Sequence, residues 1–507
     1  MTTSLAARAA LALLLMIGFY LLALGLAGGL IGLPILEVMY TKRIHPKLAL
    51  LCVIGGVGIL ISIFPRPDRF TPPGPRLTKK RHPRLFEALE GLAARVKEPM
   101  PAEVYLVPDV NAFVTSRGGI MGFGSRRVMG VGLPLLQLLS VEEFKGVLAH
   151  ELGHFKGGDV ALGPWIYKTR GAIGRTLETF SETVLQYPFR AYGYVFLTLT
   201  GAVSRHQELE ADALAASVVG PKVFASGLKK VHGGAPAFDA FMQHEYLPAL
   251  SAGSRPPLAG GFRLFLRADE IARAVRDGVR DELAHGKVSL YDTHPPLRER
   301  LANLEGLPQQ GEAGKSPAAV TLLDDVDELE QQLLVELFGA EARKLSPRAW
   351  EELAHEVLVP RWREALVDVG ARLAGVTPAS LPERLDRLQD LVDRTSPGGG
   401  PPIGREEART RAKGVISIAL TVVLADAGWR VTAAPGQPTV ATRGERSLEP
   451  GKLVEQLVAG ELDADAWRRT WAEVGLADAP LVPAAAPPEP APAKPQRAVA
   501  RRRRPTA

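Results

Sequence analysis

The segment His150-Glu151-Leu152-Gly153-His154 lies in a stretch with the pattern of a single α-helix. Upstream of it, Ser140-Val141-Glu142-Glu143 has the Ser and Glu of a capping box, which predicts the start of that helix. Gly157-Gly158 predicts its end. On such a helix His150 and His154 lie one turn apart on the same face, with about 5–6 Å between their Cβ atoms.

This spacing allows two imidazoles to bind one tetrahedral Zn²⁺. Glu151 lies about 100° around the helix from His150, so we expect it to activate a zinc-bound water rather than bind the metal. The chain has a single cysteine, Cys52, which excludes a disulfide framework and a Cys-rich metal site. We therefore expect one Zn²⁺ per chain, held by histidines and carboxylates.

A catalytic zinc needs a third protein ligand, and the sequence SRHQELEAD (204–212) contains candidates. Glu208 and Asp212 share one face of a predicted helix. We assign Glu208 as the third ligand, and Asp212 as the acceptor of a hydrogen bond from the far nitrogen of a zinc-bound histidine. Taken alone, this stretch could be a solvated acidic helix face. Its occurrence together with the two-histidine motif favours the metal site.

The N-terminal region contains two uncharged stretches, Ala9–Leu36 and Leu48–Pro65. A membrane-spanning helix needs about 20 apolar residues, so we predict a transmembrane hairpin over residues 1–65, with spans at about 9–36 and 48–65. The alternatives are a cleaved signal peptide and a hairpin buried in a soluble core. The uncharged run is longer than the apolar region of a usual signal peptide.

Basic residues flank the predicted hairpin. Three lie in its connector, and seven lie between Arg66 and Arg84, where Asp68 is the one acidic residue. The positive-inside rule then predicts that both chain ends and the catalytic domain are cytoplasmic.

The chain has 507 residues, too many for one compact domain. Between Lys79 and Leu304 the pattern is mostly helical, with a strand pair at Glu103–Pro108 and Arg127–Gly132. A second possible strand pair, Arg430–Ala434 and Thr439–Arg443, lies near the C-terminus. The predicted domains are a hairpin (1–65), a metallopeptidase domain (66–305), a helical accessory region (319–395), a small C-terminal module (405–478) and a disordered Ala/Pro/Arg-rich tail (479–507).

The net charge of +6 comes from 61 basic and 55 acidic residues. Six basic residues and no acidic ones lie in 491–507, including Arg501–Arg504. Four arginines could neutralise a few phosphates. Because no aromatic residue is interleaved with them, we predict no specific nucleic-acid partner.

Three motifs together resemble one family of enzymes. HELGH (150–154), SRHQELEAD (204–212) and DTHPPLRER (292–300) occur in the order found in the membrane-associated gluzincin zinc metallopeptidases, which include HtpX and the CAAX prenyl endopeptidase. The resemblance covers about residues 80–305. It implies a mainly α fold with a small β-sheet, a zincin-like domain behind a membrane hairpin, here followed by a small C-terminal α/β module.

The resemblance also implies roles for other residues. Asn111 and Ala112 would hold the substrate backbone, whereas His294 and Arg300 would orient substrate and stabilise the oxyanion. The remaining histidines, including His232, are predicted to be structural or exposed. HtpX-type proteins have two further spans before the ligand glutamate, but here Val160–Val203 contains several charged residues. We predict amphipathic helices there, covering the cleft or lying on the membrane.

The predicted function is that of a membrane-anchored, zinc-dependent endopeptidase acting in protein quality control. Its partners would be polypeptide substrates, either membrane-associated or misfolded proteins, and membrane lipid. The alternative is a catalytically inactive, protease-like scaffold or regulatory protein. The intact Glu151 argues against this alternative, since a scaffold has no need of an activating carboxylate.

Overall fold

The computed structural model divides the chain into two compact units. The first unit comprises Met1–Pro248 and Pro257–Leu345, and the second comprises Ala249–Pro256 and Ser346–Ala507. The residues that the structure describes are 5–64, 70–118, 125–155, 163–286, 294–308, 316–392 and 404–482. Each unit is described by itself.

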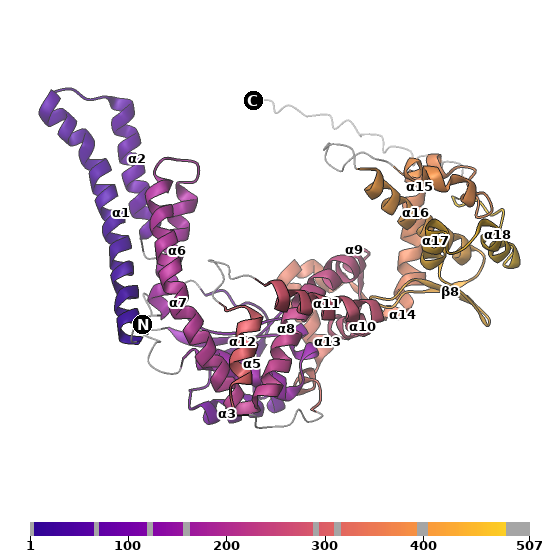
Figure 1. Cartoon of the computed structure of the whole chain (residues 1–507), viewed down its shortest axis with the longest axis horizontal. Helices are drawn as coiled ribbons and strands as arrows, with labels where there is room; N and C mark the ends of the chain where they lie inside the picture. The colour runs from indigo at the N-terminus through magenta and orange to yellow at the C-terminus, as the bar shows by residue number, and fades with distance from the viewer. Residues whose placement is uncertain are drawn as a thin grey trace, which may run out of the picture. The chain divides into compact units, whose positions relative to one another are not determined.

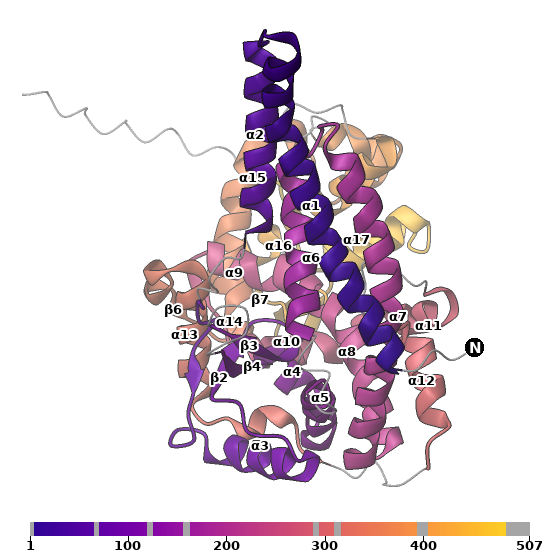
Figure 2. The ribbon, with the colours of Figure 1, turned by 90° about the vertical axis from the view of Figure 1, so that its left-hand side faces the viewer.

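Two apolar helices begin the first unit, as the sequence predicts. They are α1 (Leu5–Thr41) and α2 (Pro46–Ile63), which pack side by side as a hairpin (Figures 1 and 2). Both are long and apolar enough to cross a membrane, and only 28% and 39% of their most apolar windows is buried. A core helix of a soluble protein would be mostly buried, so these helices have unusually exposed apolar surfaces.

Two more helices pack along this hairpin. Helix α6 (Gly163–Thr179) contacts α2, and α7 (Gln186–Val219) contacts α1 and α6, which closes a four-helix bundle (Figure 2). Its core joins all four helices through buried side chains that include Phe19, Ile59, Ile173, Phe189 and Phe196.

The predicted location of residues 160–203, over the cleft or flat on the membrane, differs from this arrangement. Charged residues do not keep α6 out of the bundle, although their polar atoms are only partly satisfied there: Arg170 Nε is buried with no hydrogen-bond partner among the described residues. Arg175 Nε donates to the Ser62 carbonyl at 3.2 Å, and Arg170 Nη2 donates to Thr200 Oγ1 at 3.3 Å.

The sheet of the first unit has the strand order β1-β2-β4-β3. Its strands are β1 (Arg76–Leu77), β2 (Glu103–Val107), β3 (Ala112–Arg117) and β4 (Arg126–Gly132). The predicted pair, β2 and β4, is confirmed and is parallel, whereas β3 runs antiparallel to β4. Among the described strands β3 is an edge strand, which leaves one side of its backbone open to a partner.

Helices complete the first unit around this sheet. Aromatic side chains fill the core between several of them, including Phe224, Phe238, Phe241 and Phe262. The helices are α3 (Pro83–Val96), α4 (Leu133–Leu138), α5 (Val141–Gly153), α8 (Pro221–Phe241), α10 (Leu258–Arg267), α11 (Asp269–His285), α12 (Leu297–Glu305) and α13 (Val326–Phe338).

Residues 316–345 belong to this unit rather than to a separate accessory region. The Val141 N–H donates to the Pro317 carbonyl at 2.9 Å, and the Ala319 N–H donates to the Leu139 carbonyl at 2.8 Å. These bonds fasten the segment to the start of α5. The predicted region 319–395 is therefore divided between the two units at Leu345.

The second unit combines helices with a small antiparallel sheet. Its core contains Trp429, Trp467 and Trp471, and the predicted strand pair is confirmed as β7 and β8. Leu481 is also buried in this core, although the sequence placed it in the predicted disordered tail (479–507). Residues 483–507 of that tail lie outside the described residues. Its elements include α9 (Leu247–Ser251), which spans the unit boundary, β5 (Ser254–Arg255), β6 (Ser346–Pro347), α14 (Trp350–Leu353), α15 (Val359–Leu373), α16 (Arg405–Asp426), β7 (Arg430–Thr432), β8 (Val440–Arg443), β9 (Arg446–Leu448), α17 (Pro450–Ala459) and α18 (Ala464–Glu473).

A buried carboxylate on α13 gives the first prediction. Glu330 is 1% exposed, and its two oxygens accept hydrogen bonds from the Leu258 and Ala259 backbone N–H groups at the start of α10, both at 2.8 Å. Glu330→Ala leaves both donors without this acceptor, so we expect the free energy of unfolding to fall by about 2–4 kcal/mol. Thermal unfolding in detergent, followed by intrinsic fluorescence, measures the effect.

The matched control is Glu328→Ala on the same helix, where the exposed side chain pairs with Arg81. We expect no measurable change, because an exposed ion pair contributes little. Equal unfolding temperatures for the two variants would contradict the role assigned to Glu330.

Candidate active site

Helix α5 begins at the predicted capping box. The Ser140 hydroxyl accepts from the Glu143 N–H at 3.3 Å, and the Glu143 carboxylate accepts from the Ser140 N–H at 2.8 Å. The helix ends at Gly153, with His154 as its C-cap. The predicted stop at Gly157-Gly158 lies outside the described residues.

Helices α5 and α7 approach closely at two small residues. A Cβ added to Gly153 would lie 3.2 Å from the Cα and Cβ of Ala211, so the glycine of the motif HELGH lets the helices pack almost backbone to backbone. This contact brings His150 and His154 on α5 next to Glu208 on α7.

Three side chains converge at this crossing. The Nε2 atoms of His150 and His154 are 3.2 Å apart, and the Glu208 carboxylate lies 3.3 Å from the former and 3.6 Å from the latter. Ligand atoms of all three residues lie within 4.8 Å of one another. The structure thus brings together the three residues predicted to bind a metal.

The chemistry of these donors fits a cation. Glu208 Oε2 is buried and has no hydrogen-bond partner among the described residues, and two imidazole nitrogens face each other beside it. Burial together with the charge of His150 lowers the pKa of His154 to about 4, which leaves that ring neutral with a free lone pair. Two histidine nitrogens and a carboxylate oxygen are a donor set that Zn²⁺ accepts.

Asp212 lies behind the cluster, one helical turn after Glu208. Its Oδ1 is 2.8 Å from His150 Nδ1, the nitrogen that faces away from the other two donors. Arg300 on α12 donates to both Asp212 oxygens, at 2.6 and 2.9 Å, and both side chains are buried. Burial alone would raise the pKa of Asp212, but the hydrogen bonds from Arg300 and His150 outweigh it and lower the pKa.

The location of Arg300 differs from what its predicted role requires. From the family resemblance we expected it to orient substrate or stabilise the oxyanion. In the structure its guanidinium is 5% exposed and is engaged with the Asp212 carboxylate. This geometry fits a residue that positions Asp212, and through it His150.

Glu151 lies beside the cluster and outside it. Burial is the main reason why its pKa is raised to about 7, with a further rise from the nearby Glu208, while a backbone hydrogen bond with Val114 on β3 opposes the shift. A carboxylate with a pKa near neutrality can both accept and return a proton. Its contact with β3 places it next to the edge strand.

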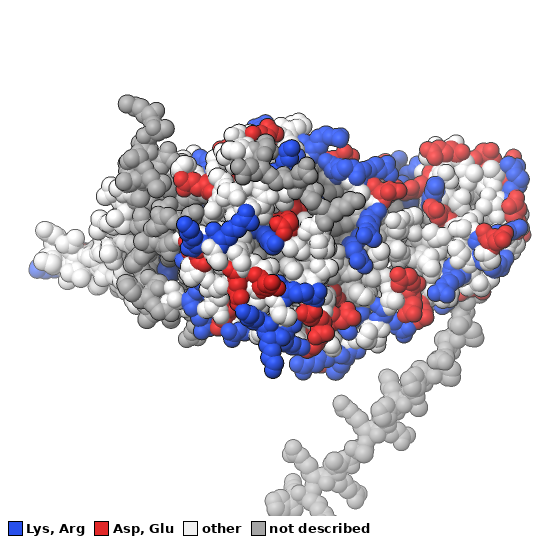
Figure 3. All heavy atoms as spheres, turned by 90° about the horizontal axis from the view of Figure 1, so that it is seen from below, with Lys and Arg blue, Asp and Glu red and all other residues white. Residues whose placement is uncertain are grey.

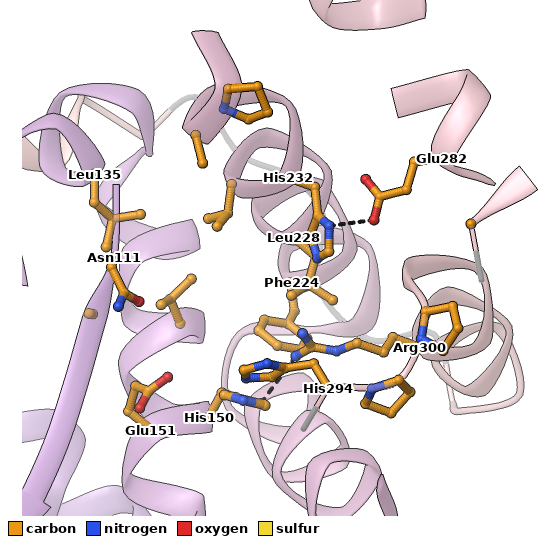
Figure 4. A pocket seen from close by; sticks show the side chains of 18 residues that line it. Asn111, Leu135, His150, Glu151, Phe224, Leu228, His232, Glu282, His294 and Arg300 are labelled. Atoms are coloured by element: carbon orange, nitrogen blue, oxygen red, sulfur yellow. Dashed lines mark hydrogen bonds and ion pairs between the residues drawn. The ribbon is translucent and has the colours of Figure 1, made fainter. Parts of the chain in front are cut away.

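The other predicted site residues line one cavity of about 460 Å³ with His150 and Glu151 (Figure 4). Asn111 and Ala112 lie at the start of β3, and His294 Nε2 lies 3.6 Å from Glu208 Oε2. A Cβ at Gly132 would lie 1.9 Å from the Asp109 carbonyl, so a glycine is required where β4 supports the backbone of Asn111. His294 is half exposed and can reach a ligand in the cavity.

One wall of this cavity was not predicted from the sequence. Phe224, Leu228 and His232 on α8, and Glu282 on α11, also line it. His232 was predicted to be structural or exposed. The spacing of four residues between Phe224, Leu228 and His232 placed them on one helix face, but nothing in the sequence indicated that this face borders the cluster.

The pairing of Asp212 with His150 gives the second prediction. Asp212→Asn weakens the acceptor that fixes the His150 ring, so we expect the affinity for Zn²⁺ to fall about 10- to 100-fold. Competition with a fluorescent zinc chelator measures the affinity directly. Glu210→Gln, an exposed position on the same helix, is the control and should keep wild-type affinity. Unchanged affinity in Asp212→Asn would show that Asp212 does not support a ligand.

Comparisons with known proteins agree with this geometry. The model of peptidase family M48 matches residues 79–307. A protein named Protease HtpX homolog from Desulfatibacillum aliphaticivorans is 28% identical over 257 residues, which are 46% of this chain and 72% of the relative. A second, from Ralstonia pickettii (strain 12J), is 29% identical over 248 residues, 45% of this chain and 76% of the relative. No solved structure matches. The matched region contains the whole cluster of α5 and α7, and over this region the chain is similar to peptidase family M48 and to proteases named HtpX homolog.

Proposed function

We propose that this chain is a zinc-dependent endopeptidase anchored in a membrane, and that it cleaves membrane-associated or misfolded proteins. One observation carries the proposal: His150, His154 and Glu208 converge within 4.8 Å, next to Glu151 and an accessible cavity. A half-buried carboxylate beside such a cluster, facing the cavity and with its pKa raised to about 7 by its surroundings, supports a catalytic site over a structural metal site or a scaffold.

His150, His154 and Glu208 would hold the metal. A bound Zn²⁺ supplies a Lewis acid that polarises the scissile carbonyl and lowers the pKa of water towards about 7. Asp212 keeps the His150 ring oriented, and Arg300 keeps Asp212 ionised and in place. Asp212 and Arg300 therefore act through His150 and need no contact with substrate.

Glu151 moves the proton. As the carboxylate it accepts a proton from the attacking water, and as the acid it returns that proton to the leaving amine. His294, half exposed and 3.6 Å from Glu208, would donate a hydrogen bond to the oxyanion. In this mechanism Glu151 and His294 are the catalytic residues, and Arg300 is a positioning residue.

Strand β3 would hold the substrate. It is an edge strand among the described strands, and an extended peptide can add to such an edge through backbone hydrogen bonds. Asn111 and Ala112, at its start, line the cavity with Glu151. Binding of this kind needs an extended segment, and misfolded proteins and exposed termini provide one.

Membrane anchoring would come from the four-helix bundle. Leu51 on α2 and Tyr194 on α7 are 67% and 61% exposed, and many large apolar side chains of α1 and α2 are also exposed. Among the described atoms at the end formed by α1 and α2, Figure 3 shows almost none that are charged, apart from basic side chains at its tip. Because α7 also carries Glu208, the active site would lie close to the lipid surface. The basic residues after α2 support a cytoplasmic orientation.

The proton-transfer role gives the third prediction. Glu151→Gln keeps the size of the side chain but removes the base, so we expect hydrolysis of an unfolded protein substrate to fall about 10²- to 10⁴-fold with zinc retained. Activity is measured with a fluorescence-quenched casein, and bound zinc by elemental analysis. Glu142→Gln, a surface position on the same helix, is the control. Stoichiometric zinc in a wild-type chain that hydrolyses neither unfolded nor membrane proteins would refute the proposal.

The bundle gives the fourth prediction. With Cys52→Ala as background, a fluorophore is attached at Leu51→Cys, Tyr194→Cys or Lys229→Cys, and the chain is placed in vesicles with nitroxide-labelled lipids. We expect strong quenching at the first two positions and little at Lys229, which is exposed on α8. Quenching at position 51 alone would restrict the lipid contact to α1 and α2, and quenching at neither would contradict membrane anchoring.

A further inference from the structure

The cavity beside the cluster extends along one face of α8. Phe224, Leu228 and His232 lie on successive turns of this helix and all line the cavity (Figure 4). At one end the Phe224 ring stacks on His150, with 6.0 Å between ring centroids and 27° between planes. Eight residues of helix span about 12 Å, so this face leads from the metal ligands to a point well away from them.

Most of this wall is apolar. Phe224 and Leu228 are buried, and Leu135 of α4, Val147 of α5 and Val231 of α8 continue the lining. A polar substrate side chain placed here would lose its hydrogen bonds to water without replacing them. An apolar side chain would be stabilised in proportion to the surface that it buries.

A His–Glu pair lies further along this wall. His232 Nδ1 is 2.7 Å from Glu282 Oε1, and the pair joins α8 to α11 (Figure 4). The close packing of these helices holds it in place, because Gly233 lies against Val275 and Val279 of α11. Because His232 occupies Oε1 of Glu282, the pair attracts a cationic substrate side chain less than an unpaired carboxylate would, and Glu282 repels an anionic one.

We propose that this cavity is a specificity pocket, which selects a large apolar side chain next to the scissile bond and rejects charged ones through the His232–Glu282 pair. The proposal deepens the proposed peptidase function and rests on it. The substrate class is therefore extended polypeptide in which Leu, Met or Phe adjoins the cleaved bond. The cavity, at about 460 Å³, has room for the largest of these side chains.

The test uses the full chain in detergent with Zn²⁺ and a set of fluorescence-quenched peptides. The peptides differ only in the residues on either side of one bond, which are Ala, Leu, Phe, Lys or Asp, and mass spectrometry locates each cut. We expect kcat/KM to be about 10- to 100-fold higher for Leu or Phe than for Ala on one side of the bond. Lys and Asp at that side should be cleaved more slowly than Ala.

Three variants test the wall and the ion pair. Leu228→Trp fills the cavity, so the ratio of kcat/KM for Phe to that for Ala should fall at least tenfold. Leu228→Ala enlarges it, and the ratio of Phe to Leu should rise. His232→Leu leaves Glu282 without this partner, so cleavage beside Lys should rise relative to Leu. Lys229→Trp places the same bulky residue on the exposed side of α8 and should leave all these ratios unchanged.

The outcomes separate this proposal from the proposed function. Hydrolysis that depends on Glu151 but has the same selectivity in both Leu228 variants and the wild type would overturn the pocket and leave the peptidase intact. Unchanged discrimination against Lys in His232→Leu would remove the role of the ion pair. No Glu151-dependent hydrolysis of any peptide or protein would remove both proposals together.

Discussion

The close crossing of α5 and α7 is the contact on which the site depends. It is possible because Gly153 and Ala211 face each other, and a larger residue at either position would separate the helices. Two nitrogen donors come from one helix and an oxygen donor from the other, so a small increase in helix separation would open the cluster of His150, His154 and Glu208. Packing of two backbones thereby controls the geometry of a candidate metal site.

A buried ionic network then couples this crossing to a third helix. Asp212 receives hydrogen bonds from Arg300 of α12 and lies 2.8 Å from His150 Nδ1. Burying such a pair has a large desolvation cost, so it is weak evidence for stability by itself. This cost is consistent with a network whose role is to fix the orientation of the candidate metal ligand His150. It also holds the segment around His294 next to the cluster, because that segment leads directly into α12, the helix that carries Arg300.

Helix α7 belongs to the four-helix bundle as well as to the candidate active site, and its motif SRHQELEAD indicates only the second role. Its first half packs in the bundle with α1, α2 and α6, and its second half carries Glu208 and Asp212. A continuous helix thus runs from the exposed apolar bundle to the candidate active site. Charged residues such as Arg170 and Arg175 made this region look unsuited to the bundle, but their guanidinium groups donate hydrogen bonds within it, to Thr200 and Ser62.

The sequence by itself determined the local features: the capping box, the one-turn spacing of His150 and His154, the apolar hairpin and the strands β2 and β4. These follow from helix period, capping and hydropathy, which act over a few residues. Tertiary structure alone decided that β3 pairs antiparallel with β4 beside Glu151, that Arg300 binds Asp212, and that Phe224, Leu228 and the His232–Glu282 pair form a wall of the cavity. Each of these depends on which face of one element meets another, and that is set by packing among residues far apart in the chain.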